Sequence, residues 1–180
     1  MSIPAQLQMI WPESLLNSPP KVNLPDDYGL RTYKAGDNAG YIKLMTEAGF
    51  PTFTETELNK YLQRVLPNGL FLVVHKPTDR LVATTMATHF PSELHPFGGE
   101  LGWVAGSPDH SGKGLGKAVC AAVVARFLKA GYERIYLKTD DCRLPAIKIY
   151  LQLGFTPFLF SEDMKDRWDK IISTILKTSK

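Results

Sequence analysis

The run from Gly114 to Ala130 limits the possible folds more than any other feature of this sequence, because it is apolar on almost every side of a helix. A helix that is hydrophobic all round has to be buried. Predicted strands stand before and after it, at 100–105 and 134–139, so the chain combines helices with strands. A chain of 180 residues can bury about 70% of its unfolded surface without a disulfide or a structural metal. We therefore expect a single α/β domain built on a mixed sheet.

The other periodic runs predict the element order β-α-α-β-β-β-α-β-α-β. Thr54 and Glu57 form a capping box at the start of the second helix, and residues 76–80 join two strands in an antiparallel hairpin. Pro145 in the first turn and Gly154 after the last turn delimit the fourth helix. The expected strands are 28–33, 70–75, 81–89, 100–105, 134–139 and 155–160, and the expected helices are 37–48, 54–66, 114–130 and 145–153.

The two ends of the chain differ from this body. Residues 1–27 contain prolines at positions 4, 12, 19, 20 and 25, which prevent a long helix, so we expect a Pro-rich arm extended on the surface and anchored by Trp11. The body is expected at 28–160. Within 161–180, an amphipathic helix at 163–177 should dock on the same domain by one face. Its apolar positions are Met164, Trp168, Ile171, Ile172 and Ile175.

Charge and cysteine content exclude several classes of function. The formal net charge is +3 with scattered Lys and Arg, so no electrostatic footprint for nucleic acid or an anionic membrane is present. Cys120 and Cys142 match neither a metal knuckle nor a redox pair, and His75, His95 and His110 lack metal-ligand spacing. Neither a signal-peptide pattern nor an apolar run of about 20 residues occurs. We expect a cytoplasmic monomer or homodimer that holds no metal and acts on a small molecule.

The segment from Gly106 to Lys117 is the strongest candidate for a binding site. Its glycines alternate between a predicted strand and a helix start, so backbone N–H groups can turn inward and form an anion cradle for phosphate. A flexible glycine-rich turn is the alternative. A P-loop is excluded, because five residues rather than four separate Gly106 from the Gly112–Lys113 pair and Gly114 follows. The dinucleotide fingerprint also fails, because Lys117 stands where its last glycine belongs.

Two motifs in this region resemble the GCN5-related N-acetyltransferase (GNAT) family. The family signature [Arg/Gln]-x-x-Gly-x-[Gly/Ala] is matched at 111–116 in both glycine positions, with Ser111 in place of Arg or Gln. The family helix that ends in Tyr-x-x-x-Gly-Phe is matched at 146–155, with Tyr150 as its tyrosine. Arg143 stands where the family has Asn, three residues before Ala146. The resemblance covers roughly residues 28–160 and implies a GNAT-like fold with an extra C-terminal helix.

The resemblance implies an acyl-CoA-dependent N-acetyltransferase. It would move an acetyl group from acetyl-CoA to a small acceptor, most simply a primary amine, by direct transfer in a ternary complex. The strand edge at Trp103, Val104 and Ala105 would pair with the pantetheine amides, and a Val104 or Ala105 N–H would stabilise the oxyanion. The pyrophosphate would lie on the loop, with a charged contact from Arg143. The loop residues are Ser111, Gly112, Lys113, Gly114, Leu115, Gly116 and Lys117.

Two proton transfers accompany such a reaction. In the family the tyrosine matched by Tyr150 protonates the departing thiolate, whereas a core aromatic on an apolar helix face is the alternative interpretation of this residue. The acceptor amine has to lose a proton to a carboxylate or a histidine. Glu100 is our first candidate for this base, and His89 and Glu93 are the alternatives.

The sequence says less about the acceptor site than about the coenzyme site. Phe50, Phe53, Phe90 and Phe97 lie in the loops 49–54 and 90–99, which predicts a pocket with aromatic walls, although such rings also pack within their own loops. A second hypothesis for the function is a noncatalytic acyl-CoA-binding sensor or interaction domain with a GNAT fold. The departures at Ser111 and Arg143 favour this second hypothesis.

Overall fold

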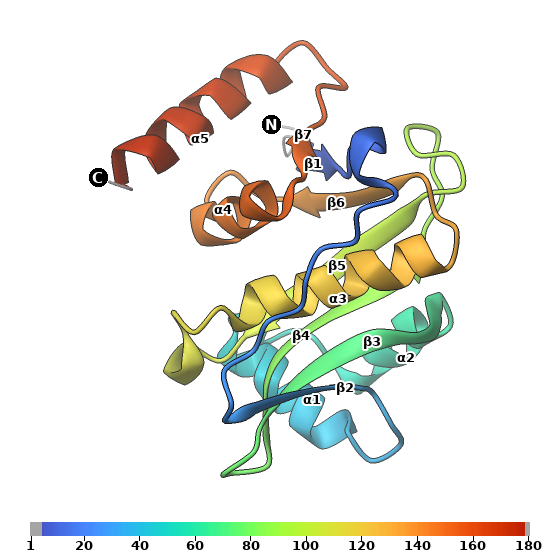
Figure 1. Ribbon diagram of the computed structural model, residues 1–180, viewed down its shortest axis with the longest axis vertical. Helices are drawn as coiled ribbons and strands as arrows, with labels where there is room; N and C mark the ends of the chain where they lie inside the picture. The colour runs from blue at the N-terminus through green and yellow to red at the C-terminus, as the bar shows by residue number, and fades with distance from the viewer. Residues whose placement is uncertain (1–4, 179–180) are drawn as a thin grey trace.

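A computed structural model describes residues 5–178. Its centre is a seven-stranded sheet in the order β2-β3-β4-β5-β6-β1-β7 (Figure 1). The strands are β1 Leu7–Ile10, β2 Tyr28–Thr32, β3 Val65–His75, β4 Arg80–His89, β5 Gly99–Gly106, β6 Ile135–Thr139 and β7 Thr156–Pro157. Within the described residues β5 and β6 are the one parallel pair of neighbouring strands, and all other neighbours are antiparallel. The expected α/β mixed sheet is confirmed.

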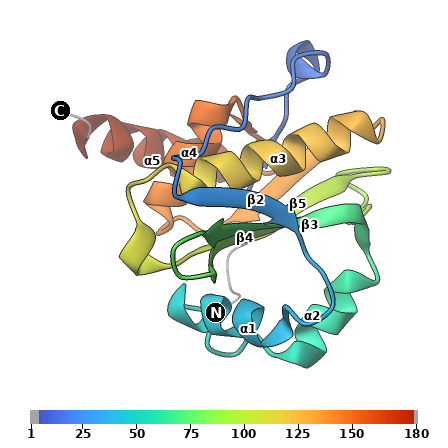
Figure 2. The same ribbon diagram turned by 60° about the horizontal axis from the view of Figure 1, so that its bottom comes forward.

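Helices cover both faces of the sheet (Figure 2). On one face lie α1 Asn38–Glu47 and α2 Glu55–Leu62, and on the other lie α3 Leu115–Lys129, α4 Leu144–Leu153 and α5 Met164–Thr178. The apolar helix α3 is buried on most sides, as its sequence predicts, because Ala118–Val124 are all buried. Short 3-10 turns follow β1 and β5, at Glu13–Leu15 and Pro108–His110.

The N-terminal segment departs from the expectation of a surface arm. Residues 7–10 form β1, which lies in the sheet between β6 and β7 and pairs antiparallel with both. The physical reason is the proline-free run between Pro4 and Pro12, whose Leu7 and Met9 are fully buried in the core. Trp11 is 3% exposed and packs edge-on against Phe155, so it anchors the segment as expected. The remainder crosses α3, where Leu24 packs near Leu115 and Val119 (Figure 1).

Two other element boundaries differ from the predicted ones. The second helix ends at Leu62 rather than near Leu66, and Pro67, Asn68 and Gly69 belong to β3, across a break in its register with β4. The last strand spans only Thr156–Pro157 and pairs with β1. The C-terminal helix docks by the expected face, because Met164, Trp168, Ile171 and Ile175 are buried in the main core cluster.

The middle of the sheet opens between β5 and β6. The two strands pair only at Gly99 with Ile135 and at Glu100 with Tyr136, and no further pairing joins them in the described residues. On the other side of β5, one residue of β4, Thr85, faces both Trp103 and Val104 in a β-bulge. The edge of β5 after Glu100 is therefore left unpaired toward β6, which creates room beside the sheet for a ligand.

Candidate functional site

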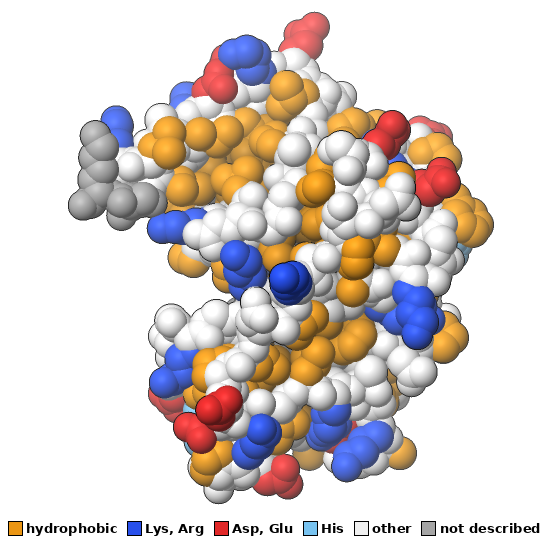
Figure 3. All heavy atoms as spheres, in the orientation of Figure 1, with side chains coloured by type: hydrophobic (Ala, Val, Ile, Leu, Met, Phe, Trp, Pro, Cys, Tyr) orange, Lys and Arg blue, Asp and Glu red, His pale blue; other side chains and the backbone are white. Residues whose placement is uncertain are grey.

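A cavity of about 510 Å³ lies where β5 and β6 separate, and we call it the loop cavity. Its floor is the strand end Val104–Ser107, and its walls are the loop before α3 and the first turns of α4. Figure 3 shows the surface hollowed between α4 and the loop before α3, with Lys and Arg side chains at the rim. Its lining residues are Ala48, Val82, Ala83, Val104, Ala105, Gly106, Ser107, Pro108, His110, Ser111, Gly112, Gly114, Leu115, Gly116, Lys117, Arg143, Pro145, Ala146, Ile149 and Gln152.

The loop between β5 and α3 has the backbone of an anion cradle. Gly112 and Gly114 adopt left-handed φ angles of 74° and 75°, which glycine reaches without steric cost. Gly114 caps α3, and Ala118 donates to the Gly114 carbonyl, so the amides of Leu115, Gly116 and Lys117 precede the first donor of the helix ladder. These amides and the positive end of α3 border the loop cavity, as a site for phosphate requires.

The Ser107 hydroxyl is an unsatisfied polar group in this cavity. Ser107 is 3% exposed and lines the loop cavity, and its Oγ has no hydrogen-bond partner among the described residues. Its backbone is fixed, because its N–H donates to the Val82 carbonyl at 2.8 Å. Buried polar atoms in native proteins almost always have a partner. This hydroxyl is therefore suited to a polar ligand group, and no pattern in the sequence predicts that role.

A second cavity, of about 360 Å³, lies beside the loop cavity, and we call it the aromatic cavity. Its rings come from α2, from β5 and from the two loops that were expected to form the acceptor pocket. Trp103 is its centre, with ring centroids of Phe50 and Tyr61 at 5.6 and 5.2 Å. The lining residues are Gln6, Phe50, Tyr61, Thr88, Phe90, Glu100, Gly102, Trp103, Lys138, Asp140 and Arg143.

The backbone conformation of Trp103 explains why its ring points into the aromatic cavity. Trp103 has a φ of 55° at the bulge, a conformation that is rare and costly for a bulky residue. Phe53 packs on the same indole at 4.5 Å, so the surrounding rings hold it in place. Backbone strain of this kind concentrates at functional sites.

Arg143 lines both cavities. Its guanidinium carbon lies 4.9 Å from the centroid of the Phe50 ring, and Nη2 lies 3.4 Å from the Val104 carbonyl oxygen. It caps α4 through its backbone alone, because its side chain makes no capping hydrogen bond. The side chain is therefore free of a helix-capping role and stands at the junction between the two cavities.

Glu100 lies on the wall of the aromatic cavity. The Tyr136 hydroxyl donates to the Phe90 carbonyl oxygen at 2.7 Å and lies 3.2 Å from Glu100 Oε2, and Lys138 Nζ lies 3.5 Å from the same carboxylate oxygen. Burial, with the Glu100 charge as the next cause, raises the pKa of Tyr136, so its phenol stays protonated and remains a donor. Glu100 is thus held at a defined place in a cavity that continues toward the open strand edge.

Tyr150 lies in the core beside these cavities. It is 4% exposed, packs with Phe155 and is not among the residues that line either cavity, although Ala146 and Ile149 of the same helix line the loop cavity. Burial, reinforced by nearby Cys120, raises the pKa of the Tyr150 hydroxyl. The phenol therefore keeps its proton, as a proton donor must, and its catalytic role stays a prediction.

Most of the expected coenzyme residues lie together. Nine of the eleven line the loop cavity: Val104, Ala105, Ser111, Gly112, Gly114, Leu115, Gly116, Lys117 and Arg143. Trp103 lines the aromatic cavity, and Lys113 lines an adjoining pocket with Lys21 and Lys117.

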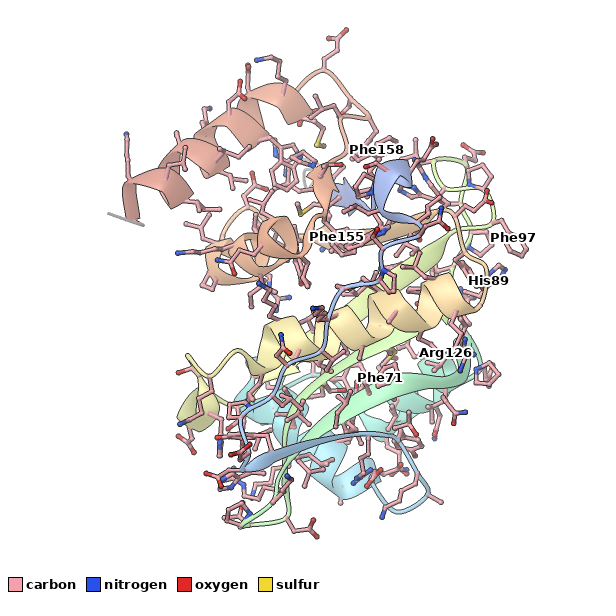
Figure 4. The ribbon with its side chains drawn as sticks, in the orientation of Figure 1. Phe71, His89, Phe97, Arg126, Phe155 and Phe158 are labelled. Carbon is pink, nitrogen blue, oxygen red and sulfur yellow. The ribbon has the colours of Figure 1, made fainter. Side chains whose placement is uncertain are left out.

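The alternative bases line neither cavity. His89 contacts the hydroxyl of Tyr132 at 2.8 Å and the ring of Phe97 (Figure 4), although its chain neighbours Thr88 and Phe90 line the aromatic cavity. Phe97 itself is 71% exposed, so it is not a wall of the predicted pocket, whereas Phe50 and Phe90 are. Glu93 is exposed and belongs to neither cavity.

The family of acetyltransferases described as Acetyltransferase (GNAT) matches residues 39–155. The chain belongs to the GNAT family. Within the described residues no helix is long and apolar enough to cross a membrane, and no group of three or more His, Cys, Asp or Glu could hold a metal ion.

Several known proteins resemble this chain over most of its length. A mycothiol acetyltransferase of Paenarthrobacter aurescens is 27% identical over 89% of this chain and 50% of its own length, and one of an Arthrobacter species is 28% identical over 92% and 51%. A GCN5-related N-acetyltransferase structure from Sphaerobacter thermophilus has a TM-score of 0.67 at 20% identity, covering 87% of this chain and 50% of the other. This chain spans about half the length of these relatives. The structural likeness establishes the fold, and the family supports an acyltransferase.

Proposed function

We propose that this GNAT domain transfers an acetyl group from acetyl-CoA to a small primary amine by direct attack in a ternary complex. The observation that carries the proposal is the open edge of β5, which runs from the aromatic cavity into the loop cavity and ends at the glycine loop. One ligand group can then lie in each cavity, with the reacting atoms between them.

The residues present fit acetyl-CoA, which supplies an activated thioester. The amides of Gly112–Lys117 would hold the pyrophosphate, and the backbone of Val104 and Ala105 would pair with the pantetheine amides. The unsatisfied Ser107 hydroxyl would take a further polar group of the coenzyme. This arrangement fixes the thioester beside the strand N–H groups, which is where electrostatic stabilisation of a developing oxyanion is most effective.

In the proposed reaction the amine nitrogen forms a bond to the acetyl carbon while the carbon–sulfur bond breaks. The electron pair of that bond leaves with sulfur, and a proton from Tyr150 converts the thiolate to a thiol. The proton lost from the amine passes to Glu100 through water. Positioned acids and bases of this kind contribute about 100- to 10,000-fold to a rate.

A noncatalytic acyl-CoA-binding domain is the second candidate function. Ser111 in place of the family's Arg or Gln, and Arg143 in place of its Asn, favour it. Calorimetry with acetyl-CoA, followed by CoA release with a panel of amines, separates the two. Both candidates bind the coenzyme, but only the transferase releases CoA faster when an amine is added. The absence of coenzyme binding would refute both.

A further inference from the structure

Arg143 is a cation without an anionic partner. Within the described residues it forms no ion pair, and its one hydrogen bond, to the Val104 carbonyl oxygen, is long at 3.4 Å. Its guanidinium stacks on Phe50, which fixes the direction of the planar fork while leaving most of its N–H groups available. A guanidinium held in this way is suited to a carboxylate, which it can bind through two parallel hydrogen bonds.

The other charges of the aromatic cavity already have partners. Lys138 lies beside Glu100 at 3.5 Å and over the Phe90 ring at 5.1 Å, so its ammonium is occupied. Asp140 accepts a hydrogen bond from Gln6. The cavity therefore presents two carboxylates, one paired cation and one unpaired cation, Arg143, within about 360 Å³. A ligand with one positive and one negative group complements this set better than a simple amine does.

The walls indicate what the rest of the ligand is made of. Phe50 and Tyr61 stand edge-on to Trp103, and none of the three is fully buried by the protein. Rings arranged in this way favour another aromatic or large apolar group packed against them, by edge-to-face packing and by removing their surface from water.

We propose that the acceptor is a free amino acid with an aromatic side chain. Its carboxylate binds Arg143, its side chain packs against Phe50, Tyr61 and Trp103, and its amine lies toward Glu100 and the open edge of β5. The inference rests on the proposed acetyl transfer and specifies its acceptor. The products are the N-acetyl amino acid and CoA thiol, since the amine proton goes to Glu100 and the thiolate takes a proton from the protein.

The test compares acceptors that differ only in the carboxylate. L-phenylalanine, L-tyrosine and L-tryptophan are each assayed against their carboxamides by CoA release at saturating acetyl-CoA. The amide has the less basic and thus more readily deprotonated amine, so intrinsic reactivity favours the amide. An Arg143–carboxylate contact reverses this order, and we expect kcat/KM for the acid to exceed that for the amide by at least about tenfold.

Variants identify Arg143 as the source of the preference. In Arg143→Met the acid-to-amide ratio should fall below one, to the intrinsic order that favours the amide, and Arg143→Lys should restore only part of the acid preference, because a point charge lacks the fork. Arg126→Met is the matched control, since Arg126 lies on α3 outside both cavities and should keep the wild-type ratio (Figure 4). Binding of N-acetyl-L-phenylalanine to the CoA-saturated protein gives a readout without turnover, and only Arg143→Met should abolish it.

Three results would overturn the inference. The first is a wild-type protein that prefers the amides. The second is an Arg143→Met protein that keeps the acid preference but binds acetyl-CoA more weakly, which would make Arg143 a coenzyme residue. The third is a failure of acetyl-CoA binding, or of CoA release with every amine tested. This result would refute the proposed function itself, and it differs from the first two because acids and amides fail alike.

Discussion

The hydroxyl of Thr85 donates a 2.7 Å hydrogen bond to the carbonyl oxygen of Gly102, the residue before the strained Trp103. This bond fixes the bulge that turns the Trp103 ring into the aromatic cavity and leaves the β5 edge open. Thr85→Val should lower the free energy of unfolding by about 1 kcal/mol, and it should lower acetyl transfer by more than the folded fraction explains. Thr84→Val is the control, because Thr84 donates a similar bond to the Phe71 carbonyl outside the bulge.

Equal stability losses with equal retention of activity in the two threonine variants would contradict a role for the bulge. Chemical denaturation gives the stability of each variant, and steady-state kinetics at full folding gives the activity. The comparison holds the chemistry of the substitution constant, so only the place of the hydrogen bond differs.

Gly114 offers a test of the anion cradle with an internal control on the same helix. Gly114, at the start of α3, and Gly131, after its end, have φ angles of 75° and 80°, and an added Cβ would meet nothing within 4 Å at either. Alanine at either position should therefore cost about 1–2 kcal/mol of stability through backbone strain alone. Only Gly114→Ala should weaken acetyl-CoA binding in calorimetry. A similar loss of affinity in Gly131→Ala would attribute the effect to global destabilisation.

Ser107→Ala should weaken coenzyme binding without destabilising the free protein. The hydroxyl is buried and unsatisfied, so removing it relieves a desolvation cost of about 1–3 kcal/mol in the free state. We expect an unchanged or higher Tm without ligand and a smaller rise in Tm with acetyl-CoA. Thr139→Val is the control, because Thr139 Oγ1 is also buried without a partner but lies outside both cavities. A Ser107→Ala protein with wild-type affinity would remove Ser107 from the site.

His95 predicts how stability depends on pH. Burial, with the Arg134 and Lys138 charges as further causes, lowers the pKa of His95 to about 4. Arg134 Nε donates to Nδ1 at 3.0 Å, so the neutral ring carries its proton on Nε2, facing Gln8. Protonation therefore favours the unfolded chain, whose histidine has a pKa near 6.5.

The neutral His95 ring contributes fully to the stability of the fold above about pH 6.5, and this contribution is lost as the pH falls toward 4. Thermal melts at a series of pH values should show the decline, and His95→Gln should reduce its slope in this window. An identical slope in the variant would assign the acid sensitivity to other groups.

The sequence predicted local structure better than it predicted tertiary neighbours. Thr54 caps the second helix as predicted, with the Glu57 amide donating to its hydroxyl, because both partners lie within one turn, whereas the Glu57 carboxylate pairs with Lys60. β1 escaped prediction, because its four residues form a strand only where β6 and β7 offer partners. His95 lies in the loop between β4 and β5 and is nevertheless 1% exposed, which the sequence did not predict, because its partners Gln8 and Arg134 are distant in sequence.

The same limit applies to the candidate site. The glycine loop could be predicted from the sequence, because its backbone conformation is encoded by the alternating glycines at 112, 114 and 116. Lys138 and Asp140 were missed, although they lie at the end of a strand parallel to its neighbour, where ligands commonly bind. The parallel pairing of β5 with β6 was the signal that could have drawn attention to them. Ser107 could not be predicted as a site residue, because the lack of a hydrogen-bond partner for its hydroxyl depends on the whole fold.

Tyr150→Phe tests proton delivery to the leaving thiolate. The substitution keeps the ring that packs against Phe155 and removes only the hydroxyl, so stability should change little. If Tyr150 is the general acid, kcat should fall by about 100- to 10,000-fold with acetyl-CoA affinity nearly preserved. Tyr41→Phe is the control, because the Tyr41 hydroxyl is likewise buried, on α1, outside both cavities. It should leave turnover unchanged.

The core position of Tyr150 makes the opposite result equally informative. A structural hydroxyl that satisfies a buried group would lower the Tm when removed, and catalysis would then follow only the folded fraction. A pH profile separates the two cases, because loss of a general acid alters the basic limb of kcat, whereas a loss of stability does not. A folded Phe variant with wild-type turnover, under conditions where chemistry limits the rate, would leave thiolate protonation to water and return Tyr150 to the core of α4 as a packing residue.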